Sequence, residues 1–222
     1  MADESLVLSM PWMSLPWDVL GDGVRRVEDR SGHGNHATPV SFAGTDVEFV
    51  DGHLGQALNL PGGGAFKGLN CGNDDSIAVM QQVSVEVIIT PNSIIGSQDI
   101  IGKYAPCTYL MFTNGTSIYF YVGGVGAGNN ARALNAFVLG KPLHIIGTHD
   151  GVNTSIYIDG VWVDDANTPL SPVMSSYDLY IGRRYNSTNE VNGLVHRVRI
   201  WRRALGAAEI YNRYKNRHRL AD

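Results

Sequence analysis

The chain has few charged residues, only two cysteines and no long apolar segment. Charged residues make up 17% of its 222 positions and the formal net charge is −4, which argues against a general nucleic-acid-binding protein. No apolar run approaches the roughly 20 residues that a membrane-spanning helix needs. The N-terminal segment contains Asp3 and Glu4 but no basic stretch, so it does not have the pattern of a secretory signal. Cys71 and Cys107 are too few for a disulfide scaffold, and we expect free thiols.

Apolar residues and glycines are abundant instead. The hydrophobic content is 44% and there are 26 glycines, a composition that favours many short strands joined by turns over a helical protein. Because all-β sandwiches of this length commonly form one unit, we expect a single domain over residues 1–222, with an N-terminal strand or arm within residues 1–20.

Several segments have the alternation that is typical of a β-strand. In VSVEVIIT, residues 83–90, every second side chain is valine or isoleucine, which is the period of two that a half-buried strand requires. Residues 117–122, 143–151, 177–182 and 191–201 are also rich in aromatic and β-branched residues, with turn residues nearby. We predict strands over these five segments, with strict alternation through the last of them.

The sequence TSIYIDGVWVDD, residues 154–165, predicts a β-hairpin. Asp159 and Gly160 stand between two apolar alternations, and this dipeptide tolerates the positive φ angles of a two-residue type I′ turn. A helix is expected within residues 206–219, where apolar side chains recur at helical spacing. Many short strands followed by one terminal helix predict an all-β fold, a two-sheet antiparallel sandwich with a short C-terminal helix.

Five segments occur in an order that points to a known family. They are DRSGHGNHA at 29–37, GQALNLPG at 55–62, VSVEVIITP at 83–91, PLHIIGTHDG and SIYIDG within 142–160, and NGLVHRVRIWRRALGAAEIYNRY at 192–214. Together they resemble the laminin-G-like, concanavalin A-like jelly-roll family, although Ile88 replaces the usual tryptophan and His149 the usual tyrosine. The resemblance implies a jelly-roll sandwich. It does not select a function, because the family includes carbohydrate-binding modules, adhesion domains, modules attached to hydrolases and lyases, and virion proteins.

The glycine-rich stretch EDRSGHGNHATP, residues 28–39, has two interpretations. In one it is a metal-free turn, in which glycines supply positive φ and the Asp, Ser and Asn side chains bind backbone N–H groups. In the other, suggested by relatives that bind a structural calcium ion, Asp29 and Asn35 each give one oxygen ligand. Zinc is not expected, because His33 and His36 lack a third ligand at a suitable spacing. We expect no required cofactor, with a structural calcium ion as the alternative.

Catalytic motifs of related folds do not occur in the sequence. Glycoside hydrolases on similar sandwiches place Glu-x-Asp-x-x-Glu on one strand, and no such trio is present. Glu86 stands alone in its strand, where we expect an exposed polar residue of the outer face. The glycine-rich runs at 62–70 and 123–130 do not lead from a parallel strand into a helix, so they lack the helix N-terminus that binds nucleotide phosphates. We therefore expect a protein that is not an enzyme.

Residues suited to ligand binding gather near predicted turns. Aromatic rings stack on the faces of sugars, and Asn, Asp and Arg side chains bind sugar hydroxyls. The candidates of these types are Tyr104, Asn129, Asn130, Arg132, Arg183, Arg184, Tyr185 and Asn186. The loop GRRYNSTNE, residues 182–190, is the strongest candidate, because two arginines and a tyrosine adjoin amide side chains.

Two other regions are candidates for contacts with proteins. Trp12, Met13 and Trp17 either pack under the edge of the sandwich or bind a partner chain, because aromatic residues and methionine are enriched in interface cores. Residues 196–219 carry eight basic side chains against one acidic side chain, a net charge of +7 that leaves −11 for the remainder of the chain. This segment either lies against the acidic body or docks an acidic partner.

Two functions are expected from the resemblance and from the features that the sequence lacks. The first is a non-catalytic binding or structural module, favoured as a virion accessory protein such as a capsid decoration or tail-associated protein. It would be made in the host cytoplasm and attached to other subunits by protein contacts. The alternative is a carbohydrate-binding module, with or without calcium, of a polysaccharide-processing system, either cytoplasmic or exported by a non-classical route. Neither nucleic-acid binding nor membrane insertion is expected.

Overall fold

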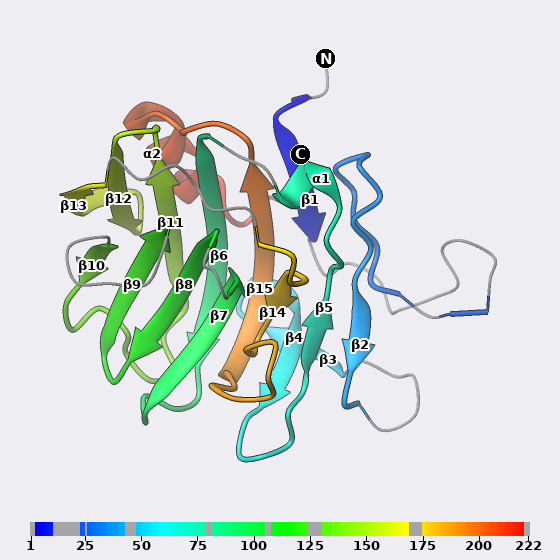
Figure 1. The fold of residues 1–222 in the computed structure, drawn as a ribbon. Helices are drawn as coiled ribbons and strands as arrows, with labels where there is room; N and C mark the ends of the chain where they lie inside the picture. The colour runs from blue at the N-terminus through cyan, green and yellow to red at the C-terminus, as the bar shows by residue number, and fades with distance from the viewer. Residues whose placement is uncertain are drawn as a thin grey trace.

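Two antiparallel β-sheets face each other in the structure, which is a computed structural model. The structure describes residues 3–10, 23–24, 26–42, 48–78, 81–104, 108–123, 130–168 and 175–219. The eight-stranded sheet has the order β13 (Val161–Asn167), β12 (Asn153–Ile158), β11 (Leu143–His149), β6 (Val83–Pro91), β15 (Asn192–Trp201), β4 (Gly55–Pro61) and β3 (Phe49–Gly52), and β1 (Leu6–Met10) also pairs with β15. Figure 1 shows this sheet behind the other.

The seven-stranded sheet lies in front in Figure 1. Its order is β10 (Asn130–Ala133), β9 (Ser117–Val122), β8 (Tyr109–Asn114), β7 (Ser97–Lys103), β14 (Tyr180–Ile181), β5 (Gly68–Asn70) and β2 (Thr38–Val40). The helices are α1 (Asp75–Ala78) and α2 (Ala207–Lys215). The predicted all-β sandwich of two antiparallel sheets with a short C-terminal helix is therefore confirmed.

Apolar side chains from alternate strand positions fill the space between the sheets. Val85 and Val87 on β6 and Phe120 on β9 belong to this core and are fully buried. Gly147 on β11 lies against the ring of Phe120, so a Cβ atom at this position would overlap the ring. The glycine therefore allows the two sheets to approach each other at this point.

The predicted hairpin and most of the predicted strands are present. β9 has the predicted bounds 117–122. β12 and β13 are joined at Asp159 and Gly160, whose φ angles of 50° and 80° are both positive, as a type I′ turn requires. The local sequence was sufficient here because the turn residues and the alternation agree.

Two predicted elements are shorter than expected. The segment 177–182 contributes only the two residues of β14, and before it the carbonyl of Tyr177 accepts a hydrogen bond from the Lys103 side chain. The helix predicted within 206–219 is α2, which ends at Lys215 with Asn216 as its C-cap. Both corrections concern the ends of elements, where tertiary contacts decide the outcome.

A β-bulge in β15 corrects the strict alternation predicted for that strand. The register shifts between Val195 and Arg197, so the side chains before and after the bulge follow different phases. Val195, Val198 and Ile200 all belong to the core between the sheets. Arg197 and Arg199 therefore lie on the outer face, where the chain covers them with α2.

Glu86 is fully buried, which corrects the expectation that it is an exposed residue. α2 packs on the outer face of the eight-stranded sheet, the far side in Figure 1. Beneath it, the Glu86 carboxylate forms hydrogen bonds with His144 (Oε1 to Nε2, 2.7 Å) and Arg199 (Oε2 to Nη1, 3.2 Å), and Arg213 Nη1 lies 4.0 Å away. Burial acts to raise the pKa of Glu86, but the hydrogen bond from His144 and the neighbouring cations lower it to about 2.

Other basic residues of the segment 196–219 also pair within the chain. Arg203 forms ion pairs with Glu209 (Nη1 to Oε2, 2.8 Å) and with Asp3 (Nη2 to Oδ2, 3.0 Å). One turn along α2, Arg213 Nη2 lies 3.2 Å from Glu209 Oε1. These contacts favour the interpretation in which the basic segment packs against the acidic body. Docking of an acidic partner stays a prediction.

The edges of the two sheets meet where β10 contacts β12 and β13. The backbone N–H of Arg132 on β10 donates a hydrogen bond to Oδ2 of Asp164 on β13, at 2.9 Å. An edge strand leaves such N–H groups without a neighbouring strand. A side chain of the opposite sheet takes that place here.

Candidate functional site

The outer face of the seven-stranded sheet carries a group of stacked aromatic rings. On β8, Tyr109 and Met111 belong to the core and Phe112 lies on the outer face; on β9, Tyr119 and Tyr121 lie on the same outer face. The ring centroids are 5.0 Å apart for Phe112 and Tyr119, 5.5 Å for Phe112 and Tyr121, and 6.4 Å for the two tyrosines. Cross-strand aromatic neighbours of this kind stabilise a sheet and fix the rings in place.

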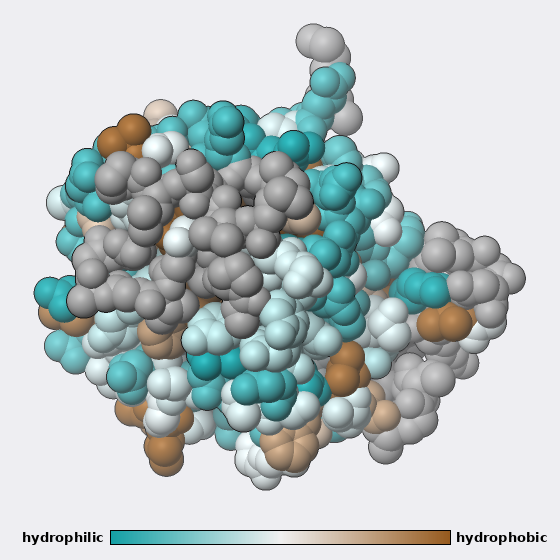
Figure 2. Space-filling view, viewed as in Figure 1, coloured by the Kyte–Doolittle hydropathy of each residue, from teal (hydrophilic) through white to brown (hydrophobic). Residues whose placement is uncertain are grey.

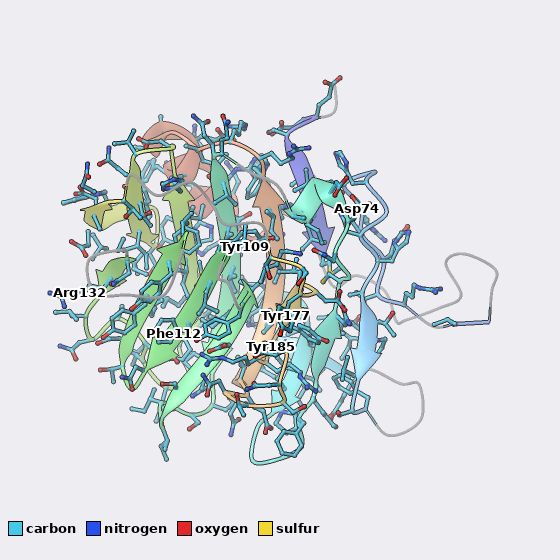
Figure 3. All side chains as sticks on the ribbon, viewed as in Figure 1. Asp74, Tyr109, Phe112, Arg132, Tyr177 and Tyr185 are labelled. Carbon is cyan, nitrogen blue, oxygen red and sulfur yellow. The ribbon has the colours of Figure 1, made fainter. Side chains whose placement is uncertain are left out.

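A second group of rings continues this surface. Tyr104, directly after β7, packs against the pair formed by Leu110 and Tyr121. The Tyr104 ring lies 6.2 Å from that of Tyr185, which lies 4.4 Å from that of Tyr177. The six rings form one surface, the aromatic strip: Tyr104, Phe112, Tyr119, Tyr121, Tyr177 and Tyr185. Figure 3 shows Phe112, Tyr177 and Tyr185 on the same face of the molecule.

The aromatic strip is half-buried and amphipathic. Tyr121 is 9% exposed and Tyr177 is 39% exposed, and five of the six rings carry a hydroxyl group. In Figure 2, the part of this face that is not drawn in grey shows apolar residues only in small, separate groups. Such a surface suits ligands that present both C–H groups and hydroxyls better than it suits a lipid or an apolar protein face.

β10 brings two predicted ligand-binding residues next to the aromatic strip. Asn130 is in register with Tyr121, and Arg132 is in register with Tyr119. Because residues in register share a face of a sheet, both side chains lie on the face of the strip. Arg132 is exposed there.

The loop 182–190 is tied to the other end of the aromatic strip by a buried carboxylate. Arg184 donates two hydrogen bonds to Asp99 on β7, from Nε to Oδ2 at 2.7 Å and from Nη2 to Oδ1 at 3.2 Å. Its guanidinium carbon lies 4.0 Å from the centre of the Tyr104 ring. Asn189 donates a further hydrogen bond to Asp99 Oδ1, at 3.0 Å. The loop is therefore held in one conformation before any ligand arrives.

Arg183 is buried within this loop and Asn186 is exposed. Arg183 donates from Nη1 to the carbonyl of Phe66 at 2.6 Å, from Nε to the carbonyl of its neighbour at 3.2 Å, and from Nη2 to the hydroxyl of Ser187. These contacts assign Arg183 to holding the loop. Of the predicted ligand-binding residues, the structure thus brings Tyr104, Arg184 and Tyr185 together at this end of the strip, with Arg183 as support. Asn186 follows in the exposed part of the loop and accepts a hydrogen bond from Thr188.

Lys103 is a fully buried cation that the sequence analysis did not single out. Its Nζ donates hydrogen bonds to the carbonyl of Tyr177, at 2.9 Å, and to Oδ1 of Asn73. Burial lowers the pKa of Lys103 to about 8, against the opposing effect of Asp178. The sequence analysis missed Lys103 and Asp99 because their partners lie 74 and 85 positions away. The alternating tyrosines of β9 were the one local signal for the strip.

The histidine- and glycine-rich loop near the N-terminus is closed by Asp29. The carboxylate accepts hydrogen bonds from the backbone N–H groups of Ser9 (2.8 Å), Ser31 (3.0 Å) and Asn35 (2.9 Å), and from the Ser31 hydroxyl (2.8 Å). Asn35 Nδ2 donates to the carbonyl of Val7 at 2.7 Å. Both predicted calcium ligands thus hold the loop to β1 through hydrogen bonds. Within the described ranges no group of three His, Cys, Asp or Glu is placed to hold a metal ion, and calcium binding stays a prediction.

Several predicted residues lie outside the described residues: Trp12, Met13, Trp17, Cys107 and Asn129. The choice between packing and partner contact therefore stays open for the two tryptophans. Cys71 is a buried free thiol, and burial raises its pKa. In the part of the chain that the structure describes, no helix has the length and apolar character to span a membrane.

A family model described as the concanavalin A-like lectin/glucanases superfamily matches residues 64–211. The chain belongs to this superfamily. The match confirms the resemblance seen in the sequence, and the matched residues include all six rings of the aromatic strip. A search of curated proteins finds no match.

Solved structures of the superfamily fold show what kinds of protein share this sandwich. The binding domain of Paraclostridial Mosquitocidal Protein 1 is 14% identical, with a TM-score of 0.69, over 98% of this chain and 53% of that one. The binding domain of botulinum neurotoxin DC, in complex with rat synaptotagmin II, is 14% identical, with a TM-score of 0.70, over 97% and 52%. Domain 4 of AbnA, an extracellular arabinanase from Geobacillus stearothermophilus, in complex with arabinotriose, is 16% identical, with a TM-score of 0.65, over 94% and 97%.

These similarities show the fold alone, because the identities are low. The chain spans about half the length of the two toxin binding domains and nearly the whole of the arabinanase domain. Two of the three are described as binding domains, and the third is a domain in complex with a sugar.

Proposed function

We propose that this chain is a non-catalytic binding module that holds a carbohydrate chain on the aromatic strip. The observation that carries the proposal is the continuity of the six rings across the outer face of the seven-stranded sheet. Aromatic rings offer flat apolar surface at a low cost in conformational entropy, and tyrosine adds a hydroxyl that can hydrogen-bond. Sugars need both properties, because each ring has C–H faces and hydroxyl edges.

The comparison with the arabinanase domain supports a sugar as the ligand, because that domain of the same fold is in complex with arabinotriose. The tight attachment of the loop 182–190 supports it further, because a loop that is already ordered loses little entropy on binding. A dissociation constant between about 1 mM and 1 μM would correspond to a binding free energy of about 4–8 kcal/mol.

Two buried strand carboxylates, Glu86 and Asp99, are not available for catalysis. Sugar hydrolysis on such folds needs two carboxyl groups that flank the bond to be cut. Glu86 lies buried under α2, and Asp99 is engaged by Arg184 and Asn189. Neither carboxylate is presented to a ligand on the strip.

Binding of arabinan and of other plant and bacterial polysaccharides by affinity gel electrophoresis tests the proposal. Tyr185→Ala removes a ring that contacts both Tyr104 and Tyr177. We expect it to weaken binding about two- to tenfold, because one stacked ring contributes about 0.5–1.5 kcal/mol. Tyr211→Ala is the matched control, since this exposed tyrosine lies on α2, on the opposite sheet. Equal binding by the two variants, or no binding of any polysaccharide by the native chain, would refute the proposal.

We also propose, as a second function, recognition of a protein partner, with the virion accessory role as its specific form. A similar toxin binding domain, of which this chain spans 52%, is in complex with the protein rat synaptotagmin II, and this supports the second function. The interface predicted at Trp12, Met13 and Trp17 remains to be tested. Trp17→Ala should abolish assembly into oligomers or attachment to a virus shell, observed by native mass spectrometry and electron microscopy, while the chain stays folded. A strictly monomeric native chain that binds no shell would contradict this second function.

A further inference from the structure

The two adjacent arginines of the loop 182–190 do not face an incoming ligand with open guanidinium groups. Arginine pairs ordinarily attract anionic groups through bidentate hydrogen bonds. Arg183 is only 4% exposed, and all three of its nitrogen atoms donate to protein oxygens. Arg184 places Nε and Nη2 on the two oxygens of Asp99 and stacks on Tyr104. The guanidinium groups of the loop 182–190 are therefore engaged within the protein, and Arg184 is the one paired with a carboxylate.

Asp99 holds the central position in this arrangement. It lies on β7, in register with Phe112 of the aromatic strip, and is only 1% exposed. Besides the two hydrogen bonds from Arg184, it accepts one from Asn189, so the carboxylate oxygens are directed at these partners. A bidentate pair of this kind is neutral as a unit and keeps its geometry, because both partners are packed.

We propose that Asp99 makes the aromatic strip selective for uncharged sugar chains by neutralising Arg184. The inference rests on the proposed carbohydrate-binding function and names its ligand class. A sugar carboxylate placed on this end of the strip would meet a guanidinium that is already paired and the negative charge of Asp99. An uncharged sugar needs only the rings and hydrogen-bonding groups such as the amide of Asn186.

Arg132, at the other end of the strip, does not reverse this preference. Its side chain is exposed to water, where a single ion pair with a flexible ligand contributes little and is screened by salt. The control for a change of charge is Lys215→Gln, because Lys215 is exposed on α2, against the opposite sheet, and belongs to no part of the proposed site. It should leave the preference for uncharged polymers unchanged.

The experiment measures the binding of two polymers, arabinan, which is uncharged, and polygalacturonate, which carries a carboxylate on each sugar, at low and at high salt. The native chain should bind arabinan at least about tenfold more tightly. Asp99→Asn leaves Arg184 with an uncompensated charge, so binding of polygalacturonate should rise about tenfold at low salt and fall again at high salt. The double variant D99N/R184Q removes both charges and should return to the native preference.

The outcomes separate this inference from the function on which it rests. A native chain that binds polygalacturonate more tightly than arabinan would overturn the inference and leave carbohydrate binding intact. The same holds if folded Asp99→Asn gains no affinity for polygalacturonate. If Asp99→Asn fails to fold, the double variant decides, because loss of its preference for arabinan would overturn the inference. A native chain that binds no polysaccharide removes the proposed function itself, and the inference with it.

Discussion

Replacement of Glu86 by glutamine should lower the free energy of unfolding at neutral pH more than the replacement of an exposed charged residue does. The carboxylate is fully buried between His144, Arg199 and Arg213, and its pKa is lowered from an ordinary 4.5 to about 2. Such a shift corresponds to about 3 kcal/mol of stability at pH 7. Glu86→Gln loses this contribution and leaves Arg199 buried without its carboxylate, and removal of one partner of a buried pair costs about 3–5 kcal/mol. We expect a loss of about 3 kcal/mol in the free energy of unfolding.

The same reasoning predicts the dependence on pH. The pKa of Glu86 is lower in the folded chain than in the unfolded chain, so the stabilisation is complete above about pH 4.5 and is lost as the pH falls through the folded value of about 2. Urea denaturation of the native chain should therefore show a loss of stability between pH 4.5 and 2. In Glu86→Gln this part of the slope should be absent.

Glu209→Gln is the control for this measurement, because its carboxylate pairs with Arg203 and Arg213 but is about one-third exposed. Exposed pairs contribute about 0–1 kcal/mol, so this variant should remain close to the native stability. A loss of less than about 1 kcal/mol for Glu86→Gln at pH 7, or a native pH slope in that variant, would show that the buried cluster does not stabilise the attachment of α2.

Two further predictions concern the core and the N-terminal loop. Gly147→Ala should lower the free energy of unfolding by about 1–3 kcal/mol, because its Cβ overlaps the Phe120 ring, whereas Gly206→Ala, with open space around it, should cost less than about 1 kcal/mol in thermal denaturation. Chelation by EDTA should leave the melting temperature unchanged, because four hydrogen bonds already engage the Asp29 carboxylate; a drop that added calcium reverses would establish the metal site.

The sandwich was predictable from the sequence because its signals are local. The hairpin at Asp159 and Gly160 follows from a dipeptide and two flanking alternations, and β9 follows from six residues alone. The bulge in β15 was not predictable in this way. His196 lies at the bulge and forms a hydrogen bond with Thr90 on β6, a partner 106 positions away. No local sequence pattern predicts a contact over this separation.

The candidate site was predictable only in its loop residues. Tyr104, Arg184 and Tyr185 were chosen because they adjoin turns, and they do meet in the structure. Their surroundings depend on pairing between distant strands. Asp99 reaches Arg184 only because β7 and β14 are neighbours in one sheet, and a buried Glu86 requires a helix that begins 121 residues later, at Ala207. Sequence patterns give the residue types at a site, but the topology of the sheets decides which of them become partners.

The hydrogen bond between Asp164 and the backbone N–H of Arg132 affects how the edge of the seven-stranded sheet can pair with another copy of the protein. Sheets grow into aggregates when a strand from another molecule finds open donors along an edge. The carboxylate of Asp164 already occupies a donor that such a strand would require, and its negative charge repels a second copy in the same position. β10 is therefore protected at this position against pairing with a strand of a neighbouring copy.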